Sequence, residues 1–138
     1  GRLADQINGY GGNDKIFGNA GDDFIDGGTG NDSITGGAGF DEITGGLGND
    51  RFIFTQLDGS TDTIIDFAPG SDVLVFSKKT FGITSVSIGT SETDDFVPGK
   101  TFHYNTDTGF LFISKQEEPI AYFANLPATL AMRDFVLV

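Results

Sequence analysis

Gly27-Gly28-Thr29-Gly30-Asn31-Asp32-Ser33-Ile34-Thr35 is one of five consecutive nine-residue units between Gly9 and Ile53. We number the positions of each unit 1 to 9 from its first glycine. Position 6 is always aspartate and position 8 is always bulky and apolar: Asp14, Asp23, Asp32, Asp41 and Asp50, with Ile16, Ile25, Ile34, Ile43 and Phe52. The last three units follow Gly-Gly-x-Gly-x-Asp-x-apolar-x without exception.

The two halves of each unit predict different backbone structures. The glycines of positions 1 to 4 allow positive φ and tight turns. The last three positions place one apolar residue between two variable ones, which is typical of a very short strand with one buried side chain. Two units then make one coil of a flattened helix, in which units n and n+2 stack roughly 4.8 Å apart. This predicts one sheet lined by Ile16, Ile34 and Phe52, and a facing sheet lined by Ile25 and Ile43.

The same stacking predicts two rows of carboxylates. Asp14 lies over Asp32 and Asp32 over Asp50 in one row, and Asp23 lies over Asp41 in the other. Two bare carboxylates about 5 Å apart repel by on the order of 3 kcal/mol at an effective dielectric near 20. A few isoleucines and many glycines cannot offset this repulsion, so the stack needs a cation.

The ligand chemistry favours calcium. Carboxylates and carbonyls on flexible loops suit Ca²⁺ better than Mg²⁺, which demands a stricter octahedron. The absence of cysteine and the single histidine argue against zinc or copper. The alternative, a flexible acidic linker, is disfavoured because a linker would not keep an apolar residue in phase with the aspartate five times.

Composition divides the chain of 138 residues into two parts. Residues 1–53 hold 15 of the 21 glycines, and residues 54–138 hold 10 of the 14 phenylalanines. We expect a parallel β-roll over residues 1–66 and a capping and secretion-signal region over residues 67–138, which share one core. The net charge of −12 disfavours nucleic acid and anionic membranes as partners. No apolar run approaches the ~20 residues of a transmembrane segment, and the N-terminus does not resemble a signal peptide. Asp5 and Ile7 are in phase with the repeat, which suggests a longer parent chain.

The second part predicts an antiparallel, β-sandwich-like continuation, so the fold class is all-β. Gly59–Ile64 is a damaged sixth repeat after a three-residue insertion, and Asp62, Asp66 and Asp72 are either ligands of a further ion or turn and cap residues. The remaining predicted elements are a strand at Val73–Phe76, a helical turn at Ser77–Phe81, a strand at Ile83–Ile88, a loop at Thr90–Lys100, a hairpin at Thr101–Ser114 with Gly109 in the left-handed region, a polar turn at Gln116–Glu118, a strand at Ile120–Ala124, a helical turn at Pro127–Met132 and a strand at Asp134–Val138.

The sequence contains no arrangement typical of a catalytic site. It has no Gly-x-Ser-x-Gly motif, no paired His and Cys and no phosphate-binding Lys-Ser/Thr ending after its glycines. His103 has no second histidine or cysteine to accompany it, which favours a structural role. An enzymatic function of this chain itself is therefore disfavoured.

These motifs resemble the RTX, or haemolysin-type, calcium-binding regions of secreted Gram-negative proteins. The repeats at 9–53 carry most of the resemblance. The segment from Asp62 to Asp72 is similar to the end of the β-roll in serralysin-type proteases and in the calcium modules of alginate epimerases. The ending Asp134–Val138 is similar to the acidic and hydrophobic ending of type I secretion substrates.

The resemblance implies a ligand set for each ion, which lies between units n and n+2. The lower unit supplies the carbonyls of positions 2 and 4 and its aspartate, and the upper unit supplies the carbonyls of positions 1 and 3 and its aspartate. The implied sites are Tyr10, Gly12 and Asp14 with Gly27, Thr29 and Asp32; Asn19, Gly21 and Asp23 with Gly36, Ala38 and Asp41; and Gly28, Gly30 and Asp32 with Gly45, Leu47 and Asp50. Pairs of Asp5 with Asp23 and of Asp41 with Asp62 would bring the total to about three to five Ca²⁺ ions.

The resemblance also implies a function. The chain would be a calcium-binding module that stays open in a calcium-poor cytosol, folds outside the cell at millimolar Ca²⁺, and carries a C-terminal type I secretion signal for an upstream domain of the parent chain. Its partners would be calcium, that domain and the type I secretion apparatus. The alternative is an accessory polysaccharide-binding module of a secreted enzyme, with Tyr104 and Tyr122 as aromatic contacts if they are exposed.

Overall fold

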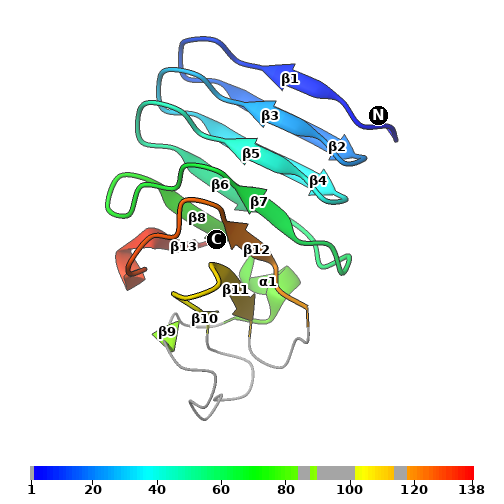
Figure 1. Ribbon diagram of the computed structural model, residues 1–138. Coiled ribbons are helices and arrows are strands. Elements are labelled where there is room, and N and C mark those ends of the chain that lie inside the picture. The colour runs from blue at the N-terminus through cyan, green and yellow to red at the C-terminus, as the bar shows by residue number, and fades with distance from the viewer. Residues whose placement is uncertain (1, 84–87, 90–101, 114–117) are drawn as a thin grey trace.

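Two β-sheets face each other across a narrow apolar core, as Figure 1 shows. The computed structural model describes residues 2–83, 88–89, 102–113 and 118–138. One sheet has eight strands in the order β1-β3-β5-β7-β12-β11-β10-β9, and the other has five in the order β13-β8-β6-β4-β2. Strands β1 to β8 therefore alternate between the sheets, which is the arrangement expected of a parallel solenoid with nine-residue half-coils.

The solenoid strands are short and pair in the predicted register. In the eight-stranded sheet they are β1 (Gln6–Asn8), β3 (Phe24–Asp26), β5 (Glu42–Thr44) and β7 (Asp62–Ile64), and in the five-stranded sheet β2 (Lys15–Ala20), β4 (Ser33–Ala38), β6 (Arg51–Phe54) and β8 (Val73–Phe76). Ile16 pairs with Ile34, and Ile34 with Phe52, on one side. Ile25 pairs with Ile43 on the other. The stacking of units n and n+2 is confirmed.

The regular spacing of 18 residues breaks after β6. Ile43 pairs with Ile64, a separation of 21 residues, and Phe52 pairs with Leu74, a separation of 22 residues. Three extra residues lie in the loop between β6 and β7, as predicted for the damaged sixth repeat, and the separation of 22 adds a fourth between β7 and β8. Because β7 and β8 keep the parallel pairing, the insertion changes the loop without ending the solenoid.

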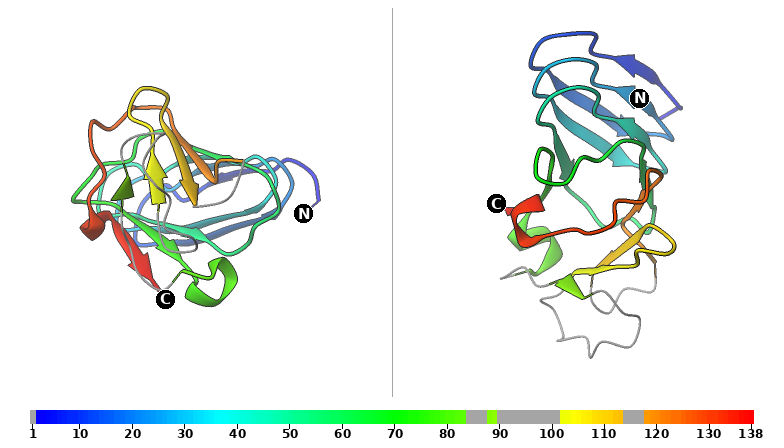
Figure 2. Two further views of the ribbon diagram at one scale, coloured as in Figure 1. Left: turned by 90° about the horizontal axis from the view of Figure 1, so that it is seen from below. Right: turned by 60° about the vertical axis from the view of Figure 1, so that its left-hand side comes forward.

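The C-terminal part continues both sheets (Figure 2). It comprises α1 (Lys78–Phe81), β9 (Ile88–Gly89), β10 (Phe102–Tyr104), β11 (Phe110–Ile113), β12 (Ala121–Phe123), a 3₁₀ turn (Met132–Asp134) and β13 (Phe135–Leu137). Strands β10, β11 and β12 are antiparallel neighbours, but β12 joins β7 in parallel and β13 joins β8 in parallel. The antiparallel continuation is confirmed, and its strands are added directly to the solenoid sheets.

Local residue preferences account for where most of these elements begin and end. The Ser77 hydroxyl accepts a hydrogen bond from Thr80 N and begins α1, and Gly82 ends it in the left-handed region. Gly109 has φ 81° in the hairpin. The predicted helical turn at Pro127–Met132 is wrong, because the turn covers Met132–Asp134, where the Asp134 carboxylate accepts a bond from Ala131 N. The loop at Thr90–Lys100, most of the strand at Ile83–Ile88 and part of the turn at Gln116–Glu118 lie outside the described residues.

One hydrophobic cluster runs from Ile16 in the repeats to Phe135 near the C-terminus. At its C-terminal end the Phe54 ring stacks on Phe76 with centroids 4.9 Å apart, and Phe102 lies 4.7 Å from Phe76. Aromatic side chains bury far more apolar surface than the single isoleucine of each half-coil. The phenylalanine-rich end therefore supplies the core that the glycine-rich coils lack. No helix among the described residues is long and apolar enough to cross a membrane.

Candidate metal centre

The position-6 aspartates form two hydrogen-bonded columns along the solenoid. In one column the backbone N–H of Asp14 donates to Asp32 Oδ1 at 2.8 Å, and Asp32 N donates to Asp50 Oδ1 at 2.9 Å. In the other column Asp23 N donates to Asp41 Oδ1 at 2.9 Å. The carboxylates of Asp32, Asp41 and Asp50 are thus each held by the coil before, and the predicted stacking of carboxylates is observed.

The second carboxylate oxygen of each repeat aspartate is buried without a hydrogen-bond donor. Within the part of the chain that the structure describes, these atoms are the Oδ2 oxygens of Asp14, Asp23, Asp32, Asp41 and Asp50. A buried carboxylate oxygen without a partner is strongly unfavourable. The row therefore fits a bound cation, because a divalent ion would satisfy the oxygens that no protein group reaches.

The loop backbone adds carbonyl oxygens to the same places. In the third predicted site Gly28 O accepts a bond from Leu47 N at 2.9 Å, and Leu47 O accepts one from Gly30 N at 2.8 Å. Each of these carbonyls keeps a second lone pair. The carbonyls of Gly30 and Gly45 accept no backbone hydrogen bond within the described ranges. The structure thus brings the predicted ligands of this site into adjacent loops, with oxygen atoms available to an ion.

The glycines let consecutive loops approach closely. Gly30 has φ +126°, and a Cβ there would overlap the Gly12 carbonyl oxygen of the coil below. A Cβ on Gly27 would lie 2.6 Å from Asp32 Oδ2. Tyr10 and Asn19 hold position 2 with φ of 67° and 80°, and the Tyr10 side chain is 78% exposed. A side chain fits at Tyr10 because it extends into solvent.

The three aspartates after the repeats differ from one another. Asp66 accepts bonds from Gly45 N and Gly46 N, both at 2.8 Å, and Asp72 accepts from Asp50 N and Ala68 N, both at 2.9 Å. Both oxygens of each are satisfied, so these two residues cap loops. Asp62 Oδ1 accepts a bond from Asp41 N at 3.3 Å, which continues the Asp23–Asp41 column. Of these three aspartates, only Asp62 has a carboxylate oxygen without a hydrogen bond from the described part of the chain.

Burial raises the pKa of the aspartates at the C-terminal end of the columns. It raises the pKa of Asp62 to about 8, with added repulsion from Asp41 and Asp58. Burial also raises the pKa of Asp41, Asp50 and Asp72, each against an opposing backbone hydrogen bond. When no metal is present, burial opposes the ionisation of these carboxylates. The folded columns are therefore unstable at neutral pH.

We therefore expect the calcium-free protein to lose stability as pH rises from about 4 to 8. Asp62 releases its proton in the unfolded chain near pH 3.8 and in the folded chain only near pH 8. The free energy of unfolding therefore falls as pH rises through this window. Asp58 does not add to this loss: burial opposes its ionisation, but the hydrogen bonds from Ser60, Gly39 and its own backbone together lower its pKa below 3.8. The far-ultraviolet circular dichroism β signal that remains in excess chelator, measured at pH 5 and pH 8, checks this. An equal or larger β signal at pH 8 would contradict it.

The position-5 residues form a ladder that the sequence analysis missed. Asn31 N donates to Asn13 Oδ1 at 2.8 Å, and Asn49 N donates to Asn31 Oδ1 at 2.9 Å. The recurrence of asparagine every 18 residues is the signal that could have revealed it. The ladder fixes the loops that carry the aspartates.

Two residues considered for other functions, Tyr104 and His103, are both buried. Tyr104 is 1% exposed and its hydroxyl donates to Pro127 O at 2.8 Å. The expectation of Tyr104 as an exposed polysaccharide contact is therefore wrong. His103 is also buried. No three His, Cys, Asp or Glu side chains converge on one point within the described residues, so an ion here must take carbonyl as well as carboxylate ligands.

The geometry defines a parallel β-solenoid whose loops stack carboxylates and carbonyls around positions for a cation. The family of RTX calcium-binding nonapeptide repeats (4 copies) matches residues 1–34 and 26–55. Residues 1–55 are therefore calcium-binding RTX repeats. The matched family is a repeat family and not a catalytic one, in agreement with the prediction that this chain is not itself an enzyme.

Among solved structures, the chain is similar to the AlgE6R3 subunit from the Azotobacter vinelandii mannuronan C5-epimerase. The TM-score is 0.44 and the identity 22%, over 97% of this chain and 78% of that one. Identity at this level says nothing about a shared activity. Among curated proteins, no sequence matches this chain significantly.

Proposed function

We propose that this domain folds when it meets millimolar Ca²⁺ and that its C-terminal end directs type I export of an upstream protein. The observation that carries the calcium-driven step is the row of buried Oδ2 atoms without hydrogen bonds. The implied ligand set, from Tyr10 to Asp62, places one ion between successive loops of each column. When bound, calcium supplies the positive charge that the stacked carboxylates require.

Calcium binding and folding are one event in this proposal. The ligands come from loops 18 residues apart, so the site does not exist until the coils stack. An ion that binds only the folded state stabilises it by mass action. Extracellular oxygen-ligand sites bind at roughly 10⁻⁴–10⁻³ M, a range that separates a calcium-poor cytosol from the medium outside.

The proposed export signal occupies a defined place in the fold. Asp134 is 1% exposed and accepts bonds from Gly70 N and Ala131 N at 2.8 and 2.7 Å. Strand β13 pairs with β8, and Phe135 packs in the core. The tail is therefore part of the folded domain, and a secretion apparatus would read it only from the unfolded, calcium-poor chain.

Deletion of residues 134–138 is expected to abolish export of this chain from a Gram-negative host that expresses a type I apparatus. The full chain should accumulate in the medium and the deletion variant in the cytoplasm, as measured by immunoblot of both fractions. A calcium titration of each purified protein by circular dichroism reports folding separately. Equal amounts of both proteins in the medium would contradict the export role and leave the calcium-driven folding intact.

Polysaccharide binding is the weaker alternative. Tyr104 is buried, and the ring of Tyr122 is half-buried with its centroid 5.1 Å from that of Phe110. An aromatic contact with sugar needs an open ring face, and only part of Tyr122 is open. No described feature favours this function over calcium-driven folding.

A further inference from the structure

We propose that the folded domain associates with further copies of itself, the basic outer face of one molecule against the acidic outer face of the next. The basic face is the outer side of β2, β4 and β6, with Lys15 and Arg51. The acidic face is the outer side of β1, β3 and β5, with Asp26 and Glu42. The contact goes beyond calcium-driven folding, and it needs folded molecules because each face is made of strands from successive coils.

Basic and acidic residues are separated between the two sheets. The strands of the five-stranded sheet contain Lys15 and Arg51 and no aspartate or glutamate. The described strands of the eight-stranded sheet contain Asp26, Glu42 and the buried Asp62, and no lysine or arginine. The two outer faces therefore differ in the sign of their charge, although the net charge of the chain is −12.

The basic face combines two cations with exposed apolar surface. Lys15 pairs with Ser33, and Ser33 with Arg51, so the three side chains form one row across the strands. Phe17 projects from the same face two residues after Lys15 and is 59% exposed. Within the part of the chain that the structure describes, Lys15 and Arg51 form no salt bridge. Both charges are therefore available to a partner.

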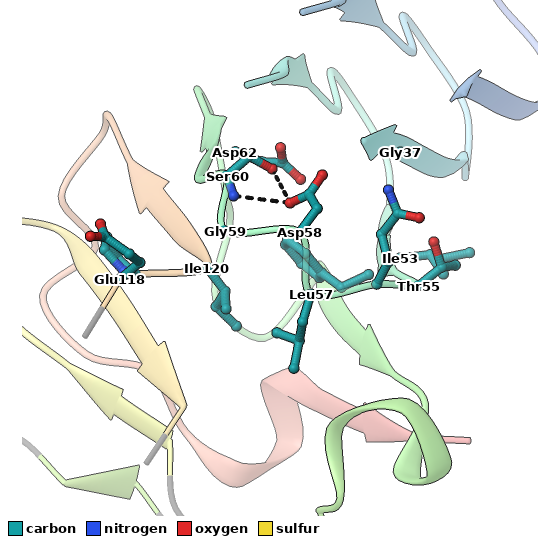
Figure 3. Close-up of a pocket in the computed structure, with 13 residues that line it drawn as sticks. Gly37, Ile53, Thr55, Leu57, Asp58, Gly59, Ser60, Asp62, Glu118 and Ile120 are labelled. Carbon is teal, nitrogen blue, oxygen red and sulfur yellow. Dashed lines mark hydrogen bonds between the residues drawn. The ribbon is translucent and has the colours of Figure 1, made fainter. Parts of the chain in front are cut away.

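The acidic face contains a groove of about 410 Å³. Its lining includes the exposed rings of Tyr10 and Phe24 and the carboxylates of Asp26 and Glu42. A cavity beside the β6–β7 loop (Figure 3), by contrast, has a volume of only about 30 Å³, which is room for about one water molecule. The groove has both the size and the lining to accept an aromatic ring and basic side chains from a second copy.

The charges have similar spacing on the two faces. Lys15 and Arg51 lie two strands apart, about 9.6 Å between backbones. Asp26 and Glu42 are diagonal neighbours on adjacent strands, about 7–8 Å apart. With the faces in contact, Lys15 would lie opposite Asp26 and Arg51 opposite Glu42. This alignment also brings Phe17 of one copy toward the groove of the next.

The contact joins two different surfaces of the same chain. The faces lie on opposite sides of the pair of sheets (Figure 2), so a molecule that binds one neighbour keeps a free face for another. Association should therefore grow with concentration as an open row of molecules and not stop at a dimer. Salt should weaken it, because the Debye length falls from about 10 Å at 0.1 M to about 3 Å at 1 M.

Arg51→Glu and Glu42→Lys test the contact, with Lys78→Glu as a matched control. Lys78 is exposed on α1, outside both faces, and its replacement changes the net charge by the same amount as Arg51→Glu. Sedimentation equilibrium measures the average mass of each full chain at saturating calcium, from about 10 µM to 1 mM, the range suited to a small polar interface. Circular dichroism at the same calcium concentration reports the folding of each variant.

We expect the mass of the wild type and of Lys78→Glu to rise with concentration, and each face variant to associate at least about tenfold more weakly. An equimolar mixture of Arg51→Glu and Glu42→Lys should associate again, because the first keeps an intact acidic face and the second an intact basic face. A wild type that stays monomeric, or a mixture that associates no better than either variant alone, would overturn the contact and leave calcium-driven folding standing. An equal loss in Lys78→Glu would attribute association to net charge and would also overturn it.

Discussion

Removal of calcium is expected to unfold the repeat region. At about 10 mM Ca²⁺ and dissociation constants of roughly 10⁻⁴–10⁻³ M, each ion contributes about 1.4–2.7 kcal/mol. Three regular sites together would raise the thermal midpoint by more than roughly 10 °C. Far-ultraviolet circular dichroism should show the β signal disappear in excess chelator and return when calcium is added. Equal concentrations of Mg²⁺ should not restore it, because the loops offer no strict octahedron.

Asp32→Asn tests whether the calcium dependence of folding arises in the aspartate columns. Asp32 belongs to two of the implied sites, and its Oδ2 is one of the buried oxygens without a partner. The variant should need several-fold more calcium to fold, whereas Asp26→Asn, on the exposed side of β3, should need the same amount as the wild type. A β signal and midpoint that do not change in chelator would remove calcium from the account of folding.

Gly30→Ala is expected to be among the most destabilising single changes in the repeats. Gly30 has φ +126°, and a Cβ there would overlap the carbonyl oxygen of Gly12, a backbone atom that cannot move unless the coils separate. We expect a loss of at least about 3 kcal/mol in the free energy of unfolding, from the strained φ and the overpacking together. Urea unfolding at a fixed, saturating calcium concentration measures it.

Gly12→Ala is the matched control for that change. Its φ is +121°, but no atom lies within 4 Å of the added Cβ. The control should therefore cost only the strain of the backbone, about 1–2 kcal/mol. Equal losses in the two variants would mean that close contact between coils does not constrain position 4. A larger loss in Gly30→Ala would show that it does.

The structure of the repeats could be predicted from the sequence because one nine-residue period specifies both the strands and their stacking register. An aspartate and an apolar residue that recur together every nine positions leave one stacking register, and the observed pairs of Ile16 with Ile34 and Ile25 with Ile43 follow it. The sequence pattern determines the calcium ligands less completely than it determines the stacking register. Asp62, Asp66 and Asp72 all follow the repeats, yet only their hydrogen bonds separate Asp62, with one oxygen left over, from two caps with none.

The C-terminal part shows where pattern reasoning fails. The antiparallel strands β10 to β12 were predicted from alternation and turn residues, but the parallel attachment of β12 to β7 was not. Local sequence does not encode which distant strand edge a strand will cover. The Asp134 carboxylate shows the same point, since it accepts a bond from Gly70 N, 64 residues earlier in the chain.

The sequence alone determined the solenoid, its register and the need for a cation, because repetition makes each local choice agree with the next. The tertiary structure decided which oxygens have no donor, that Tyr104 is inside the core, and that Gly39 N donates to the Asp58 carboxylate. These depend on contacts between residues far apart in the chain. No periodic pattern specifies such contacts, since each occurs once.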